Sequence, residues 1–127
     1  MLPVGDAWHA LALDVVREVV PVVPISTVPD APAWLRGLAN LRGSIIPVVD
    51  TGRGFGGPTT TGVTHLVLAD TAAGVAALVA SGTPAPAALG EPAGSAEHPG
   101  AVGRYAVGTR VATLLDLDVL CDVAAVR

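Results

Sequence analysis

Short apolar runs, separated by glycine and proline, dominate the hydrophobic pattern of this chain. The runs are rich in valine, a β-branched residue that favours strands, and in alanine. The 15 glycines and 11 prolines limit each run to a few residues. Many short strands at this spacing are typical of small β-barrels, not of a doubly wound α/β sheet. Strands are predicted over residues 8–13, 19–25, 44–49, 64–69, 75–80 and, as two runs divided by Gly108, 101–113.

Turns and prolines refine this pattern. Pro21 and Pro24 cannot donate backbone hydrogen bonds, so segment 19–25 must be an edge strand or an extended segment. Residues 70–74 predict a hairpin turn between two of the strands. Residues 81–100 are rich in proline, glycine and alanine and predict a long loop.

The predicted helices are few and short. Asp14 can cap one helical turn over residues 15–18. Pro32 suits the first turn of a helix that ends at Leu38. Apolar residues at helical spacing predict a closing helix over 114–126.

Composition narrows the class of protein. A chain of 127 residues suits one domain or two very small ones, and its hydrophobic content of 51% allows a sizeable core. The net charge is −4 and all the Lys+Arg cations are arginine, so no basic patch for nucleic acid is expected. Cys121 is the only cysteine, which fits a reducing cytosol. We expect neither a signal peptide at the N-terminus nor a membrane-spanning helix, since no apolar run approaches about 20 residues.

Candidate catalytic residues do not form a set. Segment 52–57 matches the G-x-G-x-x-G pattern after a strand, but residues 58–62 cannot open the helix that a dinucleotide site needs. A flexible connector is therefore the preferred interpretation, and a small nucleotide-binding enzyme is the alternative. The histidines lack metal-ligand spacing, and no serine lies in a nucleophile elbow. We expect no enzyme activity, no metal and no cofactor.

Glu18 and Arg42 are charged residues set among apolar neighbours. Arg42 lies in the polar turn 40–43, directly before an apolar strand. Two solvated surface charges would contribute little to stability. A partly desolvated, bidentate pair would instead pin the first helical turn to the second set of strands. Composition and spacing leave both interpretations open.

Three segments together resemble a known family. They are Leu11-Ala12-Leu13-Asp14-x-Val16-x-Glu18-Val19, Val28-Pro29-x-Ala31-Pro32 and Gly37-x-x-Asn40-Leu41-Arg42-Gly43-x-Ile45-x-Pro47-Val48-Val49-Asp50. The closing Leu114-Leu115-Asp116-Leu117-x-x-Leu120 also fits. In order and spacing, the chain resembles the CheW family of chemotaxis coupling proteins, whose domain also ends the histidine kinase CheA. The resemblance implies a mainly β fold: one domain over residues 1–127, with two intertwined, five-stranded SH3-like barrels packed on a shared core.

The resemblance also implies a function. It implies a non-catalytic, cytoplasmic adaptor that joins the cytoplasmic tip of chemoreceptors to the regulatory domain of a CheA-type kinase, without inserting into the membrane. Receptor binding would use a groove between the barrels, which Val16, Gly37 and Leu38 would line or flank. Gly37 would permit close approach of a receptor helix. Glu18 with Arg42 would match the family's ion pair, and Arg42 would also belong to the partner-binding residues. An orphan or regulatory module that binds another signalling partner is the alternative.

Overall fold

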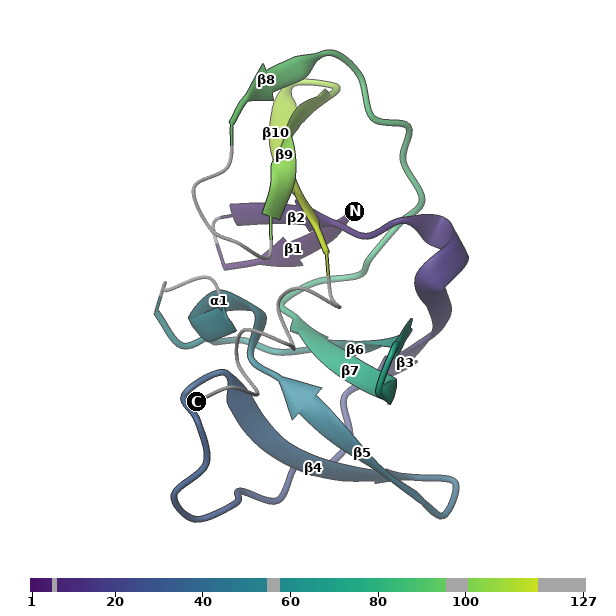
Figure 1. The fold of residues 1–127 in the computed structure, drawn as a ribbon, viewed down its shortest axis with the longest axis vertical. Helices are drawn as coiled ribbons and strands as arrows, with labels where there is room; N and C mark the ends of the chain where they lie inside the picture. Colours follow the sequence, from purple (N-terminus) through teal and green to yellow (C-terminus); the bar gives the residue numbers. More distant parts are fainter. Residues whose placement is uncertain (6, 55–57, 96–100, 117–127) are drawn as a thin grey trace.

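The computed structural model describes residues 1–5, 7–54, 58–95 and 101–116. They form two five-stranded sheets, one above the other in the view of Figure 1. The sheet that we call the terminal sheet contains, in spatial order, β1 (Leu2–Val4), β2 (Ala7–Ala10), β10 (Arg110–Leu115), β9 (Ala101–Val107) and β8 (Pro92–Gly94). The central sheet contains, in spatial order, β3 (Val16–Pro21), β6 (His65–Thr71), β7 (Gly74–Ala80), β5 (Ser44–Val49) and β4 (Leu35–Leu41).

The terminal sheet joins the two ends of the described chain. β2 pairs in parallel with β10, with Trp8 opposite Ala112. The short 3-10 helix η1 (Leu13–Val15) then leads the chain from β2 into the central sheet. The central sheet is therefore built from one continuous part of the chain, and strands from before and after it in sequence make up the terminal sheet. The predicted mainly β fold class is confirmed at this level.

β6 and β7 lie at the centre of the core because both of their faces are buried. On one face, Leu66 and Val79 pack in the same cluster as Val48 of β5. On the other face, Val67 and Ala80 pack with residues of β1. A strand buried on both faces needs a continuous apolar run, which the sequence supplies over 66–69 and 75–80. These two strands hold the terminal sheet against the central sheet.

The two hairpins of the central sheet turn tightly. β6 and β7 pair from His65 opposite Ala80 to Thr71 opposite Gly74, as the predicted turn requires. The predicted strand 44–49 is confirmed as β5, which pairs with β4 from Leu35 opposite Val49 to Leu41 opposite Ser44. The two loop residues of this second hairpin, Arg42 and Gly43, have φ values of 53° and 85°. Positive φ at both positions is the signature of a type I′ turn, which matches the twist of the strands that it joins.

The helix predictions were wrong wherever the structure tests them. The turn expected over 15–18 is a 3-10 helix over Leu13–Val15 without a side-chain cap, and β3 begins at Val16. The segment expected to be helical to Leu38 is strand from Leu35 onward, since pairing with β5 outweighs the local signal of Pro32. Leu114 and Leu115 complete β10 rather than open a helix. Residues 117–126 of that predicted helix lie outside the described residues.

Three strand boundaries also differ from expectation. β2 ends at Ala10 rather than at residue 13. β8 is a short edge strand inside the segment expected to be loop, and residues 96–100 of that loop lie outside the described residues. β3 runs from Val16 to Pro21 rather than over 19–25, although it does occupy an edge of the central sheet, as its proline predicts.

The strand pairing of the described residues does not close either sheet into a barrel. The two edges of the central sheet nevertheless approach each other. After β3 the chain turns back, so that Ser26 donates its N–H to the carbonyl of Leu38 at 2.8 Å and accepts the N–H of Leu38 at 2.9 Å. This single bridge connects the segment after β3 to β4, the opposite edge strand.

Within the described parts of the chain, no helix is both long and apolar enough to cross a membrane.

Candidate partner-binding site

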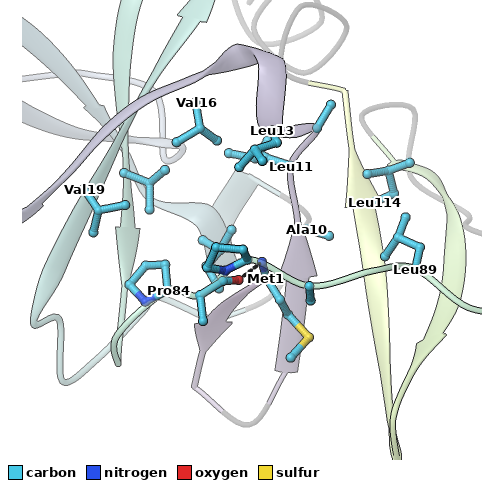
Figure 2. Close-up of a pocket in the computed structure, with 15 residues that line it drawn as sticks. Met1, Ala10, Leu11, Leu13, Val16, Val19, Pro84, Leu89 and Leu114 are labelled. Carbon is cyan, nitrogen blue, oxygen red and sulfur yellow. Dashed lines mark hydrogen bonds between the residues drawn. The ribbon is translucent and has the colours of Figure 1, made fainter.

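An apolar cavity of about 370 Å³ lies between the two sheets. Figure 2 shows side chains from both sheets and from the connection between β7 and β8 around it. Its size falls in the range of about 300–1,000 Å³ that is typical of binding pockets. Every side chain that lines it is apolar: Met1, Leu2, Ala10, Leu11, Ala12, Leu13, Val16, Val19, Val67, Pro84, Ala85, Pro86, Ala87, Leu89 and Leu114.

Large apolar side chains of the lining also reach solvent. The exposed fraction is 71% for Leu13, 42% for Val19 and 39% for Leu89. Single exposed apolar residues are common on protein surfaces, but several around one cavity mark an interaction site. They come from η1, from β3 and from the connection before β8, so the assembled fold creates this surface.

Glu18 and Arg42 meet across the central sheet. The Arg42 guanidinium donates from Nη1 to Glu18 Oε2 at 2.8 Å and from Nη2 to Glu18 Oε1. Glu18 lies on β3 and Arg42 in the turn that follows β4, and these strands stand at opposite ends of the strand order. The bidentate pair therefore connects the same two edges as the bridge between Ser26 and Leu38.

The environment of the pair differs from the expected partly desolvated one. The side chain of Arg42 is 75% exposed and that of Glu18 is 34% exposed. Glu18 also lies on a strand rather than on a helical turn. An ion pair this accessible to water is screened by salt, so it does not contribute much to stability. Its role is better described as fixing the position of the two sheet edges relative to each other.

The turn that carries Arg42 has an unusual residue for its backbone. A type I′ turn favours Asn or Gly where Arg42 has a φ of 53°. The Asn40 side chain supports the turn, since its Oδ1 accepts the N–H of Gly43 at 3.0 Å. A non-glycine residue held at positive φ often serves function rather than stability. Here the arginine places a guanidinium at the exposed tip of the hairpin.

We expect Arg42→Asn to keep the turn and to raise the pKa of Glu18 towards its ordinary value of 4.5. In the native protein the hydrogen bond from Arg42 is the largest cause that holds this pKa below 4.5. A lowered pKa means that the stabilisation is present above pH 4.5 and is lost as the pH falls through the folded-state pKa. An NMR titration of the Glu18 carboxyl group measures the change.

The control for this titration is Arg17→Asn. Arg17 is the last of the causes that act on the Glu18 pKa, and it pairs at 3.6 Å with Asp70. Its removal should therefore move the pKa of Glu18 less than removal of Arg42 does. An equal pKa in the native protein and in Arg42→Asn would show that the pair does not persist in solution.

Gly37 and Leu38 contact the protein's own chain. A Cβ on Gly37 would lie 2.2 Å from the carbonyl oxygen of Ser26 and 2.8 Å from Cγ2 of Ile25. The close approach that this glycine permits in the structure is therefore to the protein's own chain, and the expected approach of a receptor helix stays a prediction. Leu38 forms the backbone bridge to Ser26. Of the residues predicted to line the docking groove, Val16 lines the cavity, whereas Gly37 and Leu38 do not.

A buried polar cluster that the sequence analysis missed holds the loop after β5. Asp50 is 2% exposed. Its carboxylate accepts the N–H of Thr60 at 3.1 Å, the hydroxyl of Thr60 at 2.8 Å and the N–H of Arg53 at 3.1 Å. Nη1 of Arg36 donates to the same carboxylate at 3.1 Å and to the Thr60 carbonyl at 2.6 Å. An aspartate directly after a strand and before a helix is a recognisable N-cap, but no sequence signal identifies Arg36 as its partner.

This cluster also accounts for the glycine-rich segment. Asp50 precedes the short helix α1 (Thr51–Gly54), and residues 55–57 lie outside the described residues. A Cβ on Gly52 would lie 2.5 Å from the carbonyl oxygen of Pro58. The described residues after this segment, from Pro58 to β6, contain no helix that could receive a pyrophosphate. Gly52 serves the packing of the loop against itself, and the described residues of this segment give no support for a nucleotide site.

Ionisable side chains do not assemble into a reactive centre elsewhere in the described residues. These residues contain no group of three or more His, Cys, Asp or Glu side chains placed to hold a metal ion. His9 is buried on β2, and desolvation lowers its pKa to about 4. It is therefore neutral at physiological pH and belongs to the packing of the terminal sheet.

Two packed β-sheets with an apolar, partly exposed cavity between them define a small β-rich module. The chain belongs to the CheW-like domain family, whose model matches residues 1–125. In the crystal structure of the scaffolding protein TtCheW from Thermoanaerobacter tengcongensis, the same fold recurs with a TM-score of 0.73 at 22% identity, over 94% of this chain and 88% of that one.

Two proteins named as chemotaxis proteins are similar in sequence to part of this chain. The chemotaxis protein CheW of Rhizobium meliloti (strain 1021) is 40% identical over 47 residues. The probable chemotaxis protein CheW of Rhizobium etli (strain ATCC 51251 / DSM 11541 / JCM 21823 / NBRC 15573 / CFN 42) is 34% identical over 47 residues. Each match covers 37% of this chain and only 30% of the relative's length.

Proposed function

We propose that this protein is a non-catalytic adaptor that couples chemoreceptors to a CheA-type histidine kinase in chemotaxis-type signalling. The observation that carries the proposal is the match of residues 1–125 to the CheW-like domain family. The apolar cavity between the sheets supports it, because an adaptor needs a docking surface and no reactive groups. The proposed place of action is the cytoplasmic end of membrane receptor arrays.

The receptor is proposed to present the apolar face of a helix to the cavity. A helix laid in an apolar groove gains affinity by burying its hydrophobic residues. No charged or polar side chain lines the cavity, so docking leaves no such group buried without a partner. Val16 would contact this helix directly. Gly37 and Leu38 would support the site from a distance by holding the edges of the central sheet together, and Arg42 with Glu18 would do the same from the hairpin tip.

The bridge between Ser26 and Leu38 also supports a finer proposal about the fold. It lies where the two edges of the central sheet would have to join in a closed barrel. We propose that the central sheet forms the greater part of an SH3-like barrel, and that the terminal sheet forms a second one.

Binding measurements with purified partners test the proposed function. The protein should bind the cytoplasmic tip of a receptor from its own organism and, in a separate experiment, the regulatory domain of the matching CheA-type kinase. Absence of binding to both at about 100 μM would contradict the proposal, since this is weak even for a transient interface. Binding of another signalling protein instead would favour a regulatory module of the same family.

A further inference from the structure

The connection from β7 to β8 runs along one side of the terminal sheet in Figure 1. We call residues 83–89 of this connection, Thr-Pro-Ala-Pro-Ala-Ala-Leu, the strap. Five residues of the strap line the apolar cavity: Pro84, Ala85, Pro86, Ala87 and Leu89. The rest of the lining comes from the two sheets and from the segments beside them. The strap therefore covers apolar surface that the sheets alone would leave open.

Each end of the strap is anchored to the terminal sheet. Before the strap, Ser81 donates its N–H to the carbonyl of Pro3 at 2.9 Å, and its Oγ accepts the N–H of Gly5 at 2.7 Å. After the strap, Gly90 donates its N–H to the carbonyl of Ala106 at 2.7 Å. Pro3 belongs to β1 and Ala106 to β9, so both ends of the strap are tied to strands of one sheet.

Between these two anchors a single residue holds the strap in place. Ala85 donates its N–H to the carbonyl of Met1 at 3.0 Å and accepts a hydrogen bond from the Met1 amino group at 2.7 Å (Figure 2). Among the described residues, these are the only hydrogen bonds between the strap and another segment of the chain. We call this contact between Ala85 and Met1 the latch.

The strap buries little of its own surface. Every residue from Ala85 to Leu89 is exposed, although four of these five residues line the cavity. A segment with few buried apolar contacts and few hydrogen bonds opens at a small cost in free energy while the rest of the fold stays intact. The prolines at positions 84 and 86 fix φ and so keep the strap extended when it opens. Opening therefore requires the latch to break but leaves both anchors in place.

We propose that the strap is a lid on the apolar cavity, which opens when the latch breaks while both anchors and both sheets stay in place. Opening uncovers cavity residues such as Ala10, which is only 4% exposed in the closed form. The lid therefore controls when the apolar surface between the sheets becomes accessible. This property goes beyond the proposed function, because it belongs to the protein without any partner and its test uses none.

Thiol labelling at two buried alanines distinguishes opening of the lid from global unfolding. Ala10→Cys places a thiol in the cavity, and Ala76→Cys places one in the core cluster that contains Leu78, outside the cavity lining. Ala10 is 4% exposed and Ala76 is 5% exposed, so the two sites are matched in burial. Both variants also carry Cys121→Ser, which removes the only native cysteine.

The thiol at position 10 should react faster than the thiol at position 76. Its rate should change little in low concentrations of urea, because opening of the lid exposes little surface. The rate at position 76 should rise steeply with urea, as global unfolding does. Equal rates with the same steep dependence on urea would refute the lid, since only global unfolding would then expose the cavity.

Ala85→Pro and Ala87→Pro form a matched pair of variants that tests the latch. Both alanines follow a proline, are exposed and line the cavity, but of the two only Ala85 donates its N–H in a hydrogen bond. Proline removes this donor. Ala85→Pro should therefore raise the labelling rate at position 10 by about two- to tenfold over Ala87→Pro, the effect expected for one backbone hydrogen bond.

The labelling rate at position 76 is the control for the fold, and it should be the same in both proline variants. Equal rates at position 10 in the two variants would show that the latch does not hold the lid. An equal rise at positions 10 and 76 in Ala85→Pro would show that the contact with Met1 supports the whole fold rather than a local closure. Either result would overturn the proposal.

Discussion

Asp50→Ala is expected to lower the free energy of unfolding by about 3–5 kcal/mol, the usual cost of removing one partner of a buried ion pair. The carboxylate is 3% exposed, and the side chain of its partner Arg36 is 29% exposed. Alanine at this position would leave the N–H groups of Arg53 and Thr60 without their acceptor. The Thr60 N–H is buried, and a buried donor left unsatisfied costs about 1–3 kcal/mol by itself. Chemical denaturation measures the change.

Two control variants show which part of this cost comes from charge and burial. Asp50→Asn keeps the shape and an acceptor oxygen but removes the charge opposite Arg36, so its loss should be intermediate. Asp70→Ala removes a surface ion pair in which the side chain of Arg17 is 57% exposed and that of Asp70 is 56% exposed. This variant should cost less than about 1 kcal/mol. If Asp50→Ala is no more costly than Asp70→Ala, the cluster does not hold the loop after β5.

The sequence predicted the strands where local chemistry decides the structure. The hairpin from β6 to β7 follows from two apolar runs around a short turn, and the edge position of β3 follows from Pro21, which cannot donate to a neighbouring strand. The helix expected to begin at Pro32 failed because β5 takes the following residues as its pairing partner. The pairing of Trp8 with Ala112 joins distant parts of the chain, so no local pattern reveals it.

Less of the candidate site than of the fold could be predicted from the sequence. Glu18 and Arg42 stood out as charges among apolar residues, and the structure brings them together. Their exposure could not be predicted, because it depends on where the hairpin tip lies relative to the edge of β3. The cavity collects residues from Met1 to Leu114, so it exists only once both sheets have formed. Arg36 and Thr60 meet Asp50 by the same kind of long-range assembly.

Gly37→Ala is expected to lower the free energy of unfolding by several kcal/mol. Its φ of 152° is one that side chains rarely adopt, which costs about 1–3 kcal/mol. The added Cβ would lie 2.2 Å from the carbonyl oxygen of Ser26, which is backbone and cannot rotate away. Overpacking of this kind typically costs a further 1–3 kcal/mol or so. Denaturant unfolding measures the total, and faster amide exchange at Ser26 and Leu38 would locate the damage at the bridge.

Gly74→Ala separates the two causes, because Gly74 has a φ of 123° but open space where its Cβ would be. The excess loss in Gly37→Ala therefore measures the clash with Ser26. Equal losses would show that the segment after β3 does not press on β4 in solution. Since Gly37 lies outside the cavity, folded Gly37→Ala protein should still bind the receptor tip at low temperature. A binding defect there without a loss of stability would instead support the direct docking role that the family resemblance suggests.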